Sequence, residues 1–181
     1  MSSGNDARRR VTERLQVDPG TQALVSLRSM DDLLELLPPE AFRNLLFVST
    51  ETPADVEGTL RERGADPSAV GLLPVSGATT EYDGPLSVAE PVVPDDLTGL
   101  SIQFTAALDA LTPGRGWVCF DSLNVFLLYA TENRTQRFFD HAVTRARERN
   151  LCGVYGVVRE AMDDRAYERL RRGFGAEIDR R

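Results

Sequence analysis

The stretch Trp117–Leu123, which reads WVCFDSL, decides the fold class of this chain. A short apolar run ends at Asp121 and Ser122, and a new apolar segment starts at Val125. A strand that is apolar on both of its faces is typical of a parallel sheet covered by helices on both sides. In such sheets, ligands bind beyond the carboxyl ends of the strands. The stretch therefore predicts a buried strand with Asp121 at the edge of the sheet that binds ligands.

Other short apolar runs on either side of this stretch have the length of strands. These predicted strands are Ala23–Leu27, Asn44–Thr50, Val70–Ser76, Leu151–Val158 and, near the end of the chain, Ala176–Asp179. Helices are predicted between them from apolar periodicity and capping residues. These helices are Leu33–Leu37, Pro53–Arg63, Asp95–Leu111, Asn133–Arg149 and Asp163–Arg172. The alternation predicts an α/β fold, a three-layer sandwich around a mostly parallel central sheet.

Two segments fall outside this alternation. Residues 1–20 are predicted to be a peripheral N-terminal segment, with a short polar helix over Asp6–Leu15, and residues 21–181 to form one domain. Residues 77–94 are small, acidic and proline-containing, and this stretch is longer than most loops. We expect the second segment to be either functional or mobile.

The composition excludes several classes of protein. A formal net charge of −7 and a pI of about 4.8 argue against a nucleic-acid-binding surface. No apolar run reaches the roughly 18–20 residues that span a bilayer, and we expect the N-terminal residues not to act as a secretory signal, because no apolar segment follows their arginines. One histidine and two separated cysteines, Cys119 and Cys152, do not build a typical zinc site. We therefore expect a cytoplasmic protein without metal or cofactor, and with buried, unpaired cysteines.

All 21 basic residues are arginine, and the chain contains no lysine. Together with the acidic excess, this favours a protein of a salt-loving microbe, because arginine hydrates more weakly than lysine. Codon bias in a GC-rich genome is the alternative explanation, and the two can hold together.

Polar residues follow several predicted strands. The candidates for a ligand-binding cluster are Glu51, Ser76, Asp121, Ser122 and Arg159. An apolar strand that ends in aspartate is the Walker B pattern, in which the carboxylate orients magnesium, so Asp121 is a candidate metal ligand. Glu51 stands where a general base could orient water. The alternatives are that Asp121 and Ser122 cap the next helix, and that Glu51 is an exposed carboxylate near a helix N-terminus.

The loop after the first predicted strand argues against nucleotide hydrolysis. A phosphate loop reads G-x-x-x-x-G-K-[ST], whereas Leu27–Asp32 reads LRSMDD and has neither glycine nor lysine. Asp31 and Asp32 would repel a phosphate from the helix N-terminus. Arg28 does not replace the lysine, because its planar guanidinium is wider than an ammonium.

The order of these segments resembles KaiC-like ATPases. Asn44–Ser76 is similar to the segment after their phosphate-loop helix, and Val118–Tyr129 is similar to their Walker B segment. Together with Asp95–Gly99, Arg137–Arg149 and Asp163–Phe174, these segments resemble a haloarchaeal family of RecA/KaiC-like proteins that lacks the Walker A motif. The resemblance covers Gln22–Asp179. It implies a RecA-like core in which Asp121 matches the Walker B aspartate and Glu51 the catalytic glutamate.

These observations lead to one expected function and two alternatives. We expect a non-catalytic, degenerate RecA/KaiC-like domain that acts as a regulatory or scaffolding protein in cytoplasmic signalling or gene regulation. Its partner would be another protein or a second copy of the chain, with no direct nucleic-acid or membrane contact. The first alternative is a small-ligand or metal-binding protein, catalytic in a divergent way, that uses the cluster around Asp121 and Glu51. The second is an ATPase completed by a phosphate clamp from a partner subunit.

Overall fold

A computed structural model describes residues 13–29, 33–79 and 81–181 of the chain. Within these residues, seven strands form one sheet in the order β4-β3-β2-β5-β6-β1-β7, and all paired strands run parallel. The strands are β1 (Gln22–Leu27), β2 (Leu45–Ser49), β3 (Val70–Pro74), β4 (Ser87–Val88), β5 (Trp117–Phe120), β6 (Cys152–Val158) and β7 (Ala176–Asp179). The predicted α/β fold with a parallel sheet is therefore confirmed.

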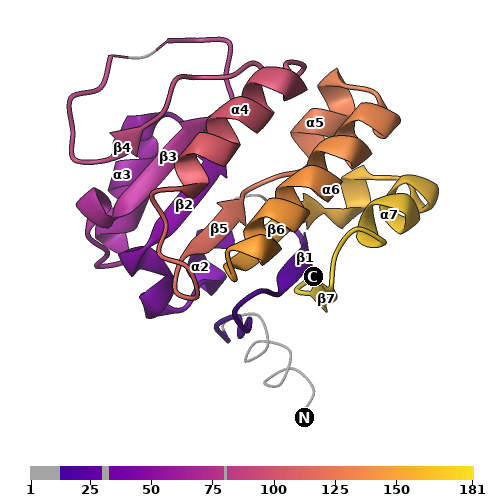
Figure 1. The fold of residues 1–181 in the computed structure, drawn as a ribbon, viewed down its shortest axis with the longest axis horizontal. Helices are drawn as coiled ribbons and strands as arrows, with labels where there is room; N and C mark the ends of the chain where they lie inside the picture. The colour runs from indigo at the N-terminus through magenta and orange to yellow at the C-terminus, as the bar shows by residue number, and fades with distance from the viewer. Residues whose placement is uncertain (1–12, 30–32, 80) are drawn as a thin grey trace.

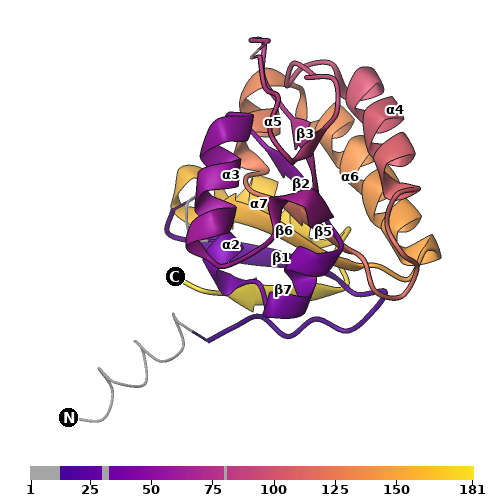
Figure 2. The same ribbon diagram turned by 90° about the vertical axis from the view of Figure 1, so that its left-hand side faces the viewer.

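Helices cover both faces of the sheet (Figures 1 and 2). The helices are α2 (Leu33–Leu36), α3 (Pro53–Glu62), α4 (Leu97–Leu108), α5 (Asn124–Tyr129), α6 (Glu132–Glu148) and α7 (Asp164–Arg171). Short 3-10 helices in the connections include η2 (Pro39–Arg43), η3 (Pro67–Ala69) and η4 (Arg159–Ala161). Helices α2 and α3 pack on one face of the sheet, and α4 to α7 pack on the other.

The core under α4 to α7 is rich in aromatic rings. The Phe120 side chain of the central strand β5 lies 5.2 Å from the Tyr155 ring and 5.3 Å from the Phe139 ring, measured between centroids. Aromatic pairs at such distances add stabilisation beyond the burial of their area. Phe120 is 1% exposed and joins β5 and β6 to α6, so the strand that carries Asp121 is held firmly.

Helix α3 begins as its sequence dictates. Thr52 is the N-cap and accepts a hydrogen bond from the backbone N–H of Asp55 at 3.2 Å, and Pro53 takes the first helical position. The helix ends before Gly64, whose φ of +70° suits glycine. These two signals fix the position of the loop between β2 and α3, which contains Glu51.

The segment 77–94 is more ordered than its sequence predicts. It contains the two-residue edge strand β4, and Val92 bridges to Val75 beside β3. Leu86 and Val92 are both buried, one in each of the two cores, and they anchor the segment to the sheet edge. The expectation that this segment lies outside the alternation of strands and helices is thus wrong for Ser87 and Val88, which pair with β3.

Two further expectations concern the start of the chain. Leu15 is buried, and its N–H donates to the carbonyl of Leu36 at 2.7 Å, so part of the segment predicted to be peripheral contributes to the core. The predicted helix over Asp6–Leu15 falls mostly outside the described residues, as do Asp31 and Asp32.

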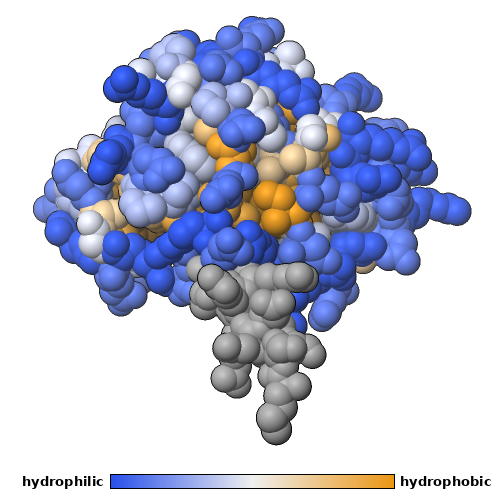
Figure 3. Space-filling view, turned by 90° about the horizontal axis from the view of Figure 1, so that it is seen from below, coloured by the Kyte–Doolittle hydropathy of each residue, from blue (hydrophilic) through white to orange (hydrophobic). Residues whose placement is uncertain are grey.

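The face seen from below is mostly hydrophilic, and its most apolar residues gather near the middle (Figure 3). In the part of the chain that the structure describes, no helix is long and apolar enough to cross a membrane.

Candidate functional site

Asp121 lies directly after β5, and its carboxylate is held by the end of the neighbouring strand β2. Only 7% of Asp121 is exposed. Its Oδ2 accepts a hydrogen bond from Ser49 Oγ at 2.5 Å, and the backbone N–H groups of Thr50 and Ser122 also donate to the carboxylate. The N–H of Asp121 itself donates to the carbonyl of Val48 at 3.1 Å. The carboxylate therefore joins the carboxyl ends of two adjacent strands.

Burial raises the pKa of Asp121 from 3.8 to about 6. The hydrogen bond from Ser49 lowers this pKa, and the nearby negative charge of Glu51 raises it. Ser49 Oγ also accepts the N–H of Glu51 at 3.0 Å, so Ser49 connects the two acidic residues. Ser49 was not among the candidates from the sequence. The signal that could have found it is a small hydroxyl residue at the end of a buried strand next to the strand of Asp121.

Asp121 and Ser122 do not cap the helix that follows them, so that alternative is wrong. The N-cap of α5 is Leu123, which makes no side-chain cap. Ser122 Oγ instead donates to Asn124 Oδ1 at 3.3 Å. The amide of Asn124 forms two hydrogen bonds with the backbone of Val158, at 2.8 and 3.1 Å, and so fastens the start of α5 to the end of β6.

Glu51 and Ser76 lie beside a different feature, a cavity of about 350 Å³. Its walls come from the ends of β2 and β3, the start of α3 and the segment 77–94, which contributes Tyr82 and Glu90. Glu51 lies near the N-terminus of α3, as in the alternative interpretation, but it is half-buried and not exposed. Asp121 is not among the residues that line this cavity. The predicted cluster is thus divided between a buried carboxylate and a neighbouring cavity.

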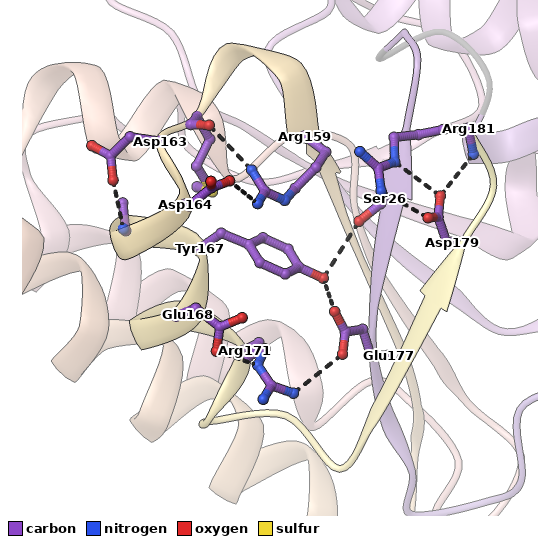
Figure 4. Close-up of polar contacts among 12 residues, drawn as sticks. Ser26, Arg159, Asp163, Asp164, Tyr167, Glu168, Arg171, Glu177, Asp179 and Arg181 are labelled. Atoms are coloured by element: carbon purple, nitrogen blue, oxygen red, sulfur yellow. Dashed lines mark hydrogen bonds and ion pairs between the residues drawn. The ribbon is translucent and has the colours of Figure 1, made fainter.

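Arg159 points toward α7 (Figure 4). Its guanidinium carbon lies 4.2 Å from the centroid of the Tyr167 ring, and its Nη2 donates to Asp164 at 2.5 Å. The Tyr167 hydroxyl in turn donates to Glu177 and accepts a 3.5 Å hydrogen bond from Ser26. The partners of Arg159 therefore tie α7 to the end of β6, and the structure does not bring this arginine into the cavity beside Glu51.

The end of β1 is where the sequence lacks a phosphate loop. Leu27 is buried, Arg28 is exposed, and α2 starts at Leu33. Gly156 of β6 packs closely here, because a Cβ on it would lie 2.8 Å from the carbonyl oxygen of Asp121 and 3.1 Å from the side chains of Leu27 and Leu33. Over the described ranges, no group of three or more His, Cys, Asp or Glu side chains is placed to hold a metal ion.

Comparisons with known proteins agree with this architecture. A KaiC-like protein from the hyperthermophilic archaeon Pyrococcus horikoshii, PH0186, superimposes with a TM-score of 0.59 over 89% of this chain and 73% of that protein, at 10% sequence identity. At that identity the similarity shows the fold alone, which is RecA/KaiC-like. No protein of curated function shows significant sequence similarity to the chain. Residues 5–179 match a family described as a family of unknown function, DUF7504, and the chain belongs to that family.

Proposed function

We propose that this domain is a non-catalytic RecA/KaiC-like module that acts as a regulatory or scaffolding protein in a cytoplasmic system. The observation that carries the proposal is that the Asp121 carboxylate is occupied by hydrogen bonds within the protein. It is buried and accepts hydrogen bonds from Ser49 and from the backbone of Thr50 and Ser122. A carboxylate whose acceptors are engaged in this way serves as a link between strands β2 and β5.

The loop after β1 supports the same proposal. Residues 27–32 contain no glycine that would let backbone N–H groups wrap a phosphate, and no lysine to neutralise it. Strand β1 itself is kept, with all its residues buried. A domain that has this sheet but lacks the phosphate loop is suited to binding other proteins and not to hydrolysing a nucleotide.

Calorimetry with Mg-ATP on the full chain tests this proposal. We expect no saturable binding in the micromolar range and no phosphate release above that of the buffer. Micromolar affinity that disappears in Asp121→Ala and persists in Asp164→Ala, a change of an exposed carboxylate on α7, would disprove the proposal. Both variants are first checked for a native near-UV circular dichroism spectrum. Measurements in low and in high salt cover the possibility that this acidic chain needs salt to fold.

A second candidate function is the binding of a small ligand. The observation in its favour is that Glu51 and Ser76 both line the 350 Å³ cavity at the carboxyl edge of the sheet. A thermal-shift screen of small metabolites and divalent cations would test it. A compound that stabilises the wild type, and Glu62→Gln, but neither Glu51→Gln nor Ser76→Ala, would support ligand binding there. Glu62 is an exposed glutamate outside the cavity and serves as the matched control.

A further inference from the structure

Helix α4 contains no charged residue over its 12 positions, LTGLSIQFTAAL. Leu97, Leu100, Phe104 and Leu108 face the core and are buried. The opposite face is exposed along Thr98, Ile102 and Ala106, and Ile102 is 64% exposed. A helix at the surface of a globular protein normally carries charged or polar residues on its solvent side. The outer face of α4 is thus polar only through uncharged side chains such as Thr98, and it exposes the apolar side chain of Ile102.

A cavity of about 490 Å³ runs along this helix. One wall is formed by α4 and the residues after it, through Gln103, Ala106, Ala107 and Ala110. The other wall is the sheet edge, with Gly71 of β3 and Ser87 and Val88 of β4, and Arg43 of η2 also lines the cavity. Figures 1 and 2 show α4 at the outside of the molecule, beside β3. We call the exposed face of α4 and this cavity the α4 groove.

The stretch of sequence that builds most of the α4 groove is acidic, whereas the Arg43 that lines its cavity comes from an earlier segment. Residues 64–114 contain seven acidic residues and no arginine. The acidic residues are Asp66, Glu81, Asp83, Glu90, Asp95, Asp96 and Asp109. The whole chain has 28 acidic residues, so 21 remain elsewhere and equal the 21 arginines. The formal net charge of −7 therefore lies in the segment that builds β3, β4 and α4.

We propose that the α4 groove docks an amphipathic helix of a partner protein whose apolar side chains meet Ile102 and whose arginine or lysine side chains face the acidic residues. This inference rests on the proposed scaffolding function and names the chemistry of its partner. Asp95 and Asp96 lie at the start of α4. Asp109 lies at its end, with 80% of its side chain exposed and its Oδ1 3.8 Å from Nη1 of Arg149. Carboxylates at both ends of an apolar face complement a helix that has an apolar stripe and basic flanks.

Two other occupants fit less well. A second copy of the chain would have to offer a basic helix, and α6 and α7 are its arginine-rich helices. Their apolar residues, such as Phe138 and Phe139 of α6 and Tyr167 of α7, are already buried in the core. A strand added to the sheet edge would pair with β4, which is only two residues long and offers few backbone hydrogen bonds.

Three synthetic peptides of about 15 residues, long enough to form several helical turns, probe the α4 groove. The first carries leucines on one helical face and arginines on the other. The second has glutamate in place of every arginine, and the third has the composition of the first with its leucines spread around the helix. Fluorescence anisotropy with the full chain should show that the first peptide binds at least about tenfold more tightly than the other two, and less tightly as salt is added. Equal affinity for the glutamate peptide would overturn the proposal.

Variants of the full chain locate the binding site. Ile102→Asp and Ala106→Arg should each weaken binding of the first peptide by about tenfold. Leu128→Asp is the matched control, because Leu128 is an 80% exposed leucine on α5 and lies outside the α4 groove. Unfolding temperatures close to that of the wild type show that each variant is folded. If Ile102→Asp does not fold, Ile102→Asn replaces it. A loss of affinity in Leu128→Asp that equals the loss at Ile102 would place the site elsewhere and disprove the inference.

The two proposals can fail separately. If the peptide does not bind and Mg-ATP does not bind either, the α4 groove is not the docking site, while the non-catalytic function stands. If Mg-ATP binds and its affinity depends on Asp121, the non-catalytic function fails whatever the peptide does.

Discussion

The guanidinium of Arg159 lies over the ring of Tyr167, with its central carbon 4.2 Å from the ring centroid. Asp164 pairs with the same guanidinium, and the Tyr167 hydroxyl donates to Glu177 of β7. Burial raises the pKa of the Tyr167 hydroxyl, with a further increase from its hydrogen bond to Glu177, so it remains a donor at neutral pH. Arg159 and Tyr167 therefore connect the end of β6, helix α7 and the edge strand β7.

We predict that Arg159→Met lowers the free energy of unfolding by about 1 kcal/mol, because it keeps the aliphatic stem and removes the cation over the ring. Urea denaturation measures this change, and amide exchange in α7 should become faster. Arg165→Met is the control, since Arg165 is an exposed arginine on the same helix. An equal loss of stability in both variants would contradict a specific role for the Arg159–Tyr167 contact.

The pKa of Asp121 should move in opposite directions in two variants. Ser49→Ala removes a hydrogen bond that lowers this pKa, so the pKa should rise above about 6. Glu51→Gln removes a nearby negative charge, so the pKa should fall. Carbon-detected NMR titration of the Asp121 carboxyl measures both. A shift in the same direction in the two variants would show that the local geometry differs from the one described.

The stability of the protein should fall as the pH rises from about 4 toward 7. The pKa of Asp121 is raised from 3.8 in the unfolded chain to about 6 in the folded one, so the folded state holds the proton more tightly. This contribution is complete below the unfolded pKa and is lost as the pH rises through the folded pKa, and it amounts to about 3 kcal/mol. Denaturation curves at several pH values measure it.

The same curves distinguish Asp121 from other carboxylates. Glu57, Asp66 and Asp179 have lowered pKa values because they accept hydrogen bonds from Tyr82, Ser68 and Arg181 respectively. Their contributions to stability are lost at lower pH, as the pH falls through those pKa values. Glu51→Gln should reduce the loss of stability between pH 4 and 7, because it lowers the folded-state pKa of Asp121. If the dependence of stability on pH is unchanged in that variant, Asp121 is not the group that causes the loss.

Gly156→Ala should destabilise the protein by about 1–3 kcal/mol, because the added Cβ meets the backbone oxygen of Asp121 and two leucine side chains. The control is Gly71→Ala in β3, where the nearest atoms to an added Cβ are 3.8 Å away. That change should cost nothing or stabilise slightly, since alanine loses less backbone entropy than glycine. Thermal unfolding compares the two, and equal effects would contradict the close packing at Gly156.

The order of helices and strands could be predicted from the sequence because most strands are short apolar runs and several helices begin at a recognisable cap. Thr52 with Pro53 before α3 and Asp163 before α7 are such caps, and both form as expected. The two residues of β4 were missed, because Ser87 and Val88 become a strand only through pairing with β3. No local pattern of the sequence contains that information.

The candidate site could be predicted less well than the fold. The position of Asp121 follows from its place after β5, but its hydrogen bond to Ser49 depends on β2 being the neighbour of β5, a relationship between residues 72 positions apart. Arg159 also follows a strand, yet it turns toward Tyr167, which a later helix brings beside it. Strand ends thus indicate the edge of the sheet on which residues lie, and tertiary contacts decide which of them meet.

The pairing of β1 has a consequence for the order in which the chain folds. Within the described residues, β1 pairs with β6 and β7, whereas β2, β3 and β5 pair among themselves. During synthesis, β1 leaves the ribosome before β2, β3 and β5, yet it waits for residues 152–179 before it gains a neighbour. Until then its apolar surface is open to misassociation, and a chain stopped before β6 would present it to chaperones and proteases.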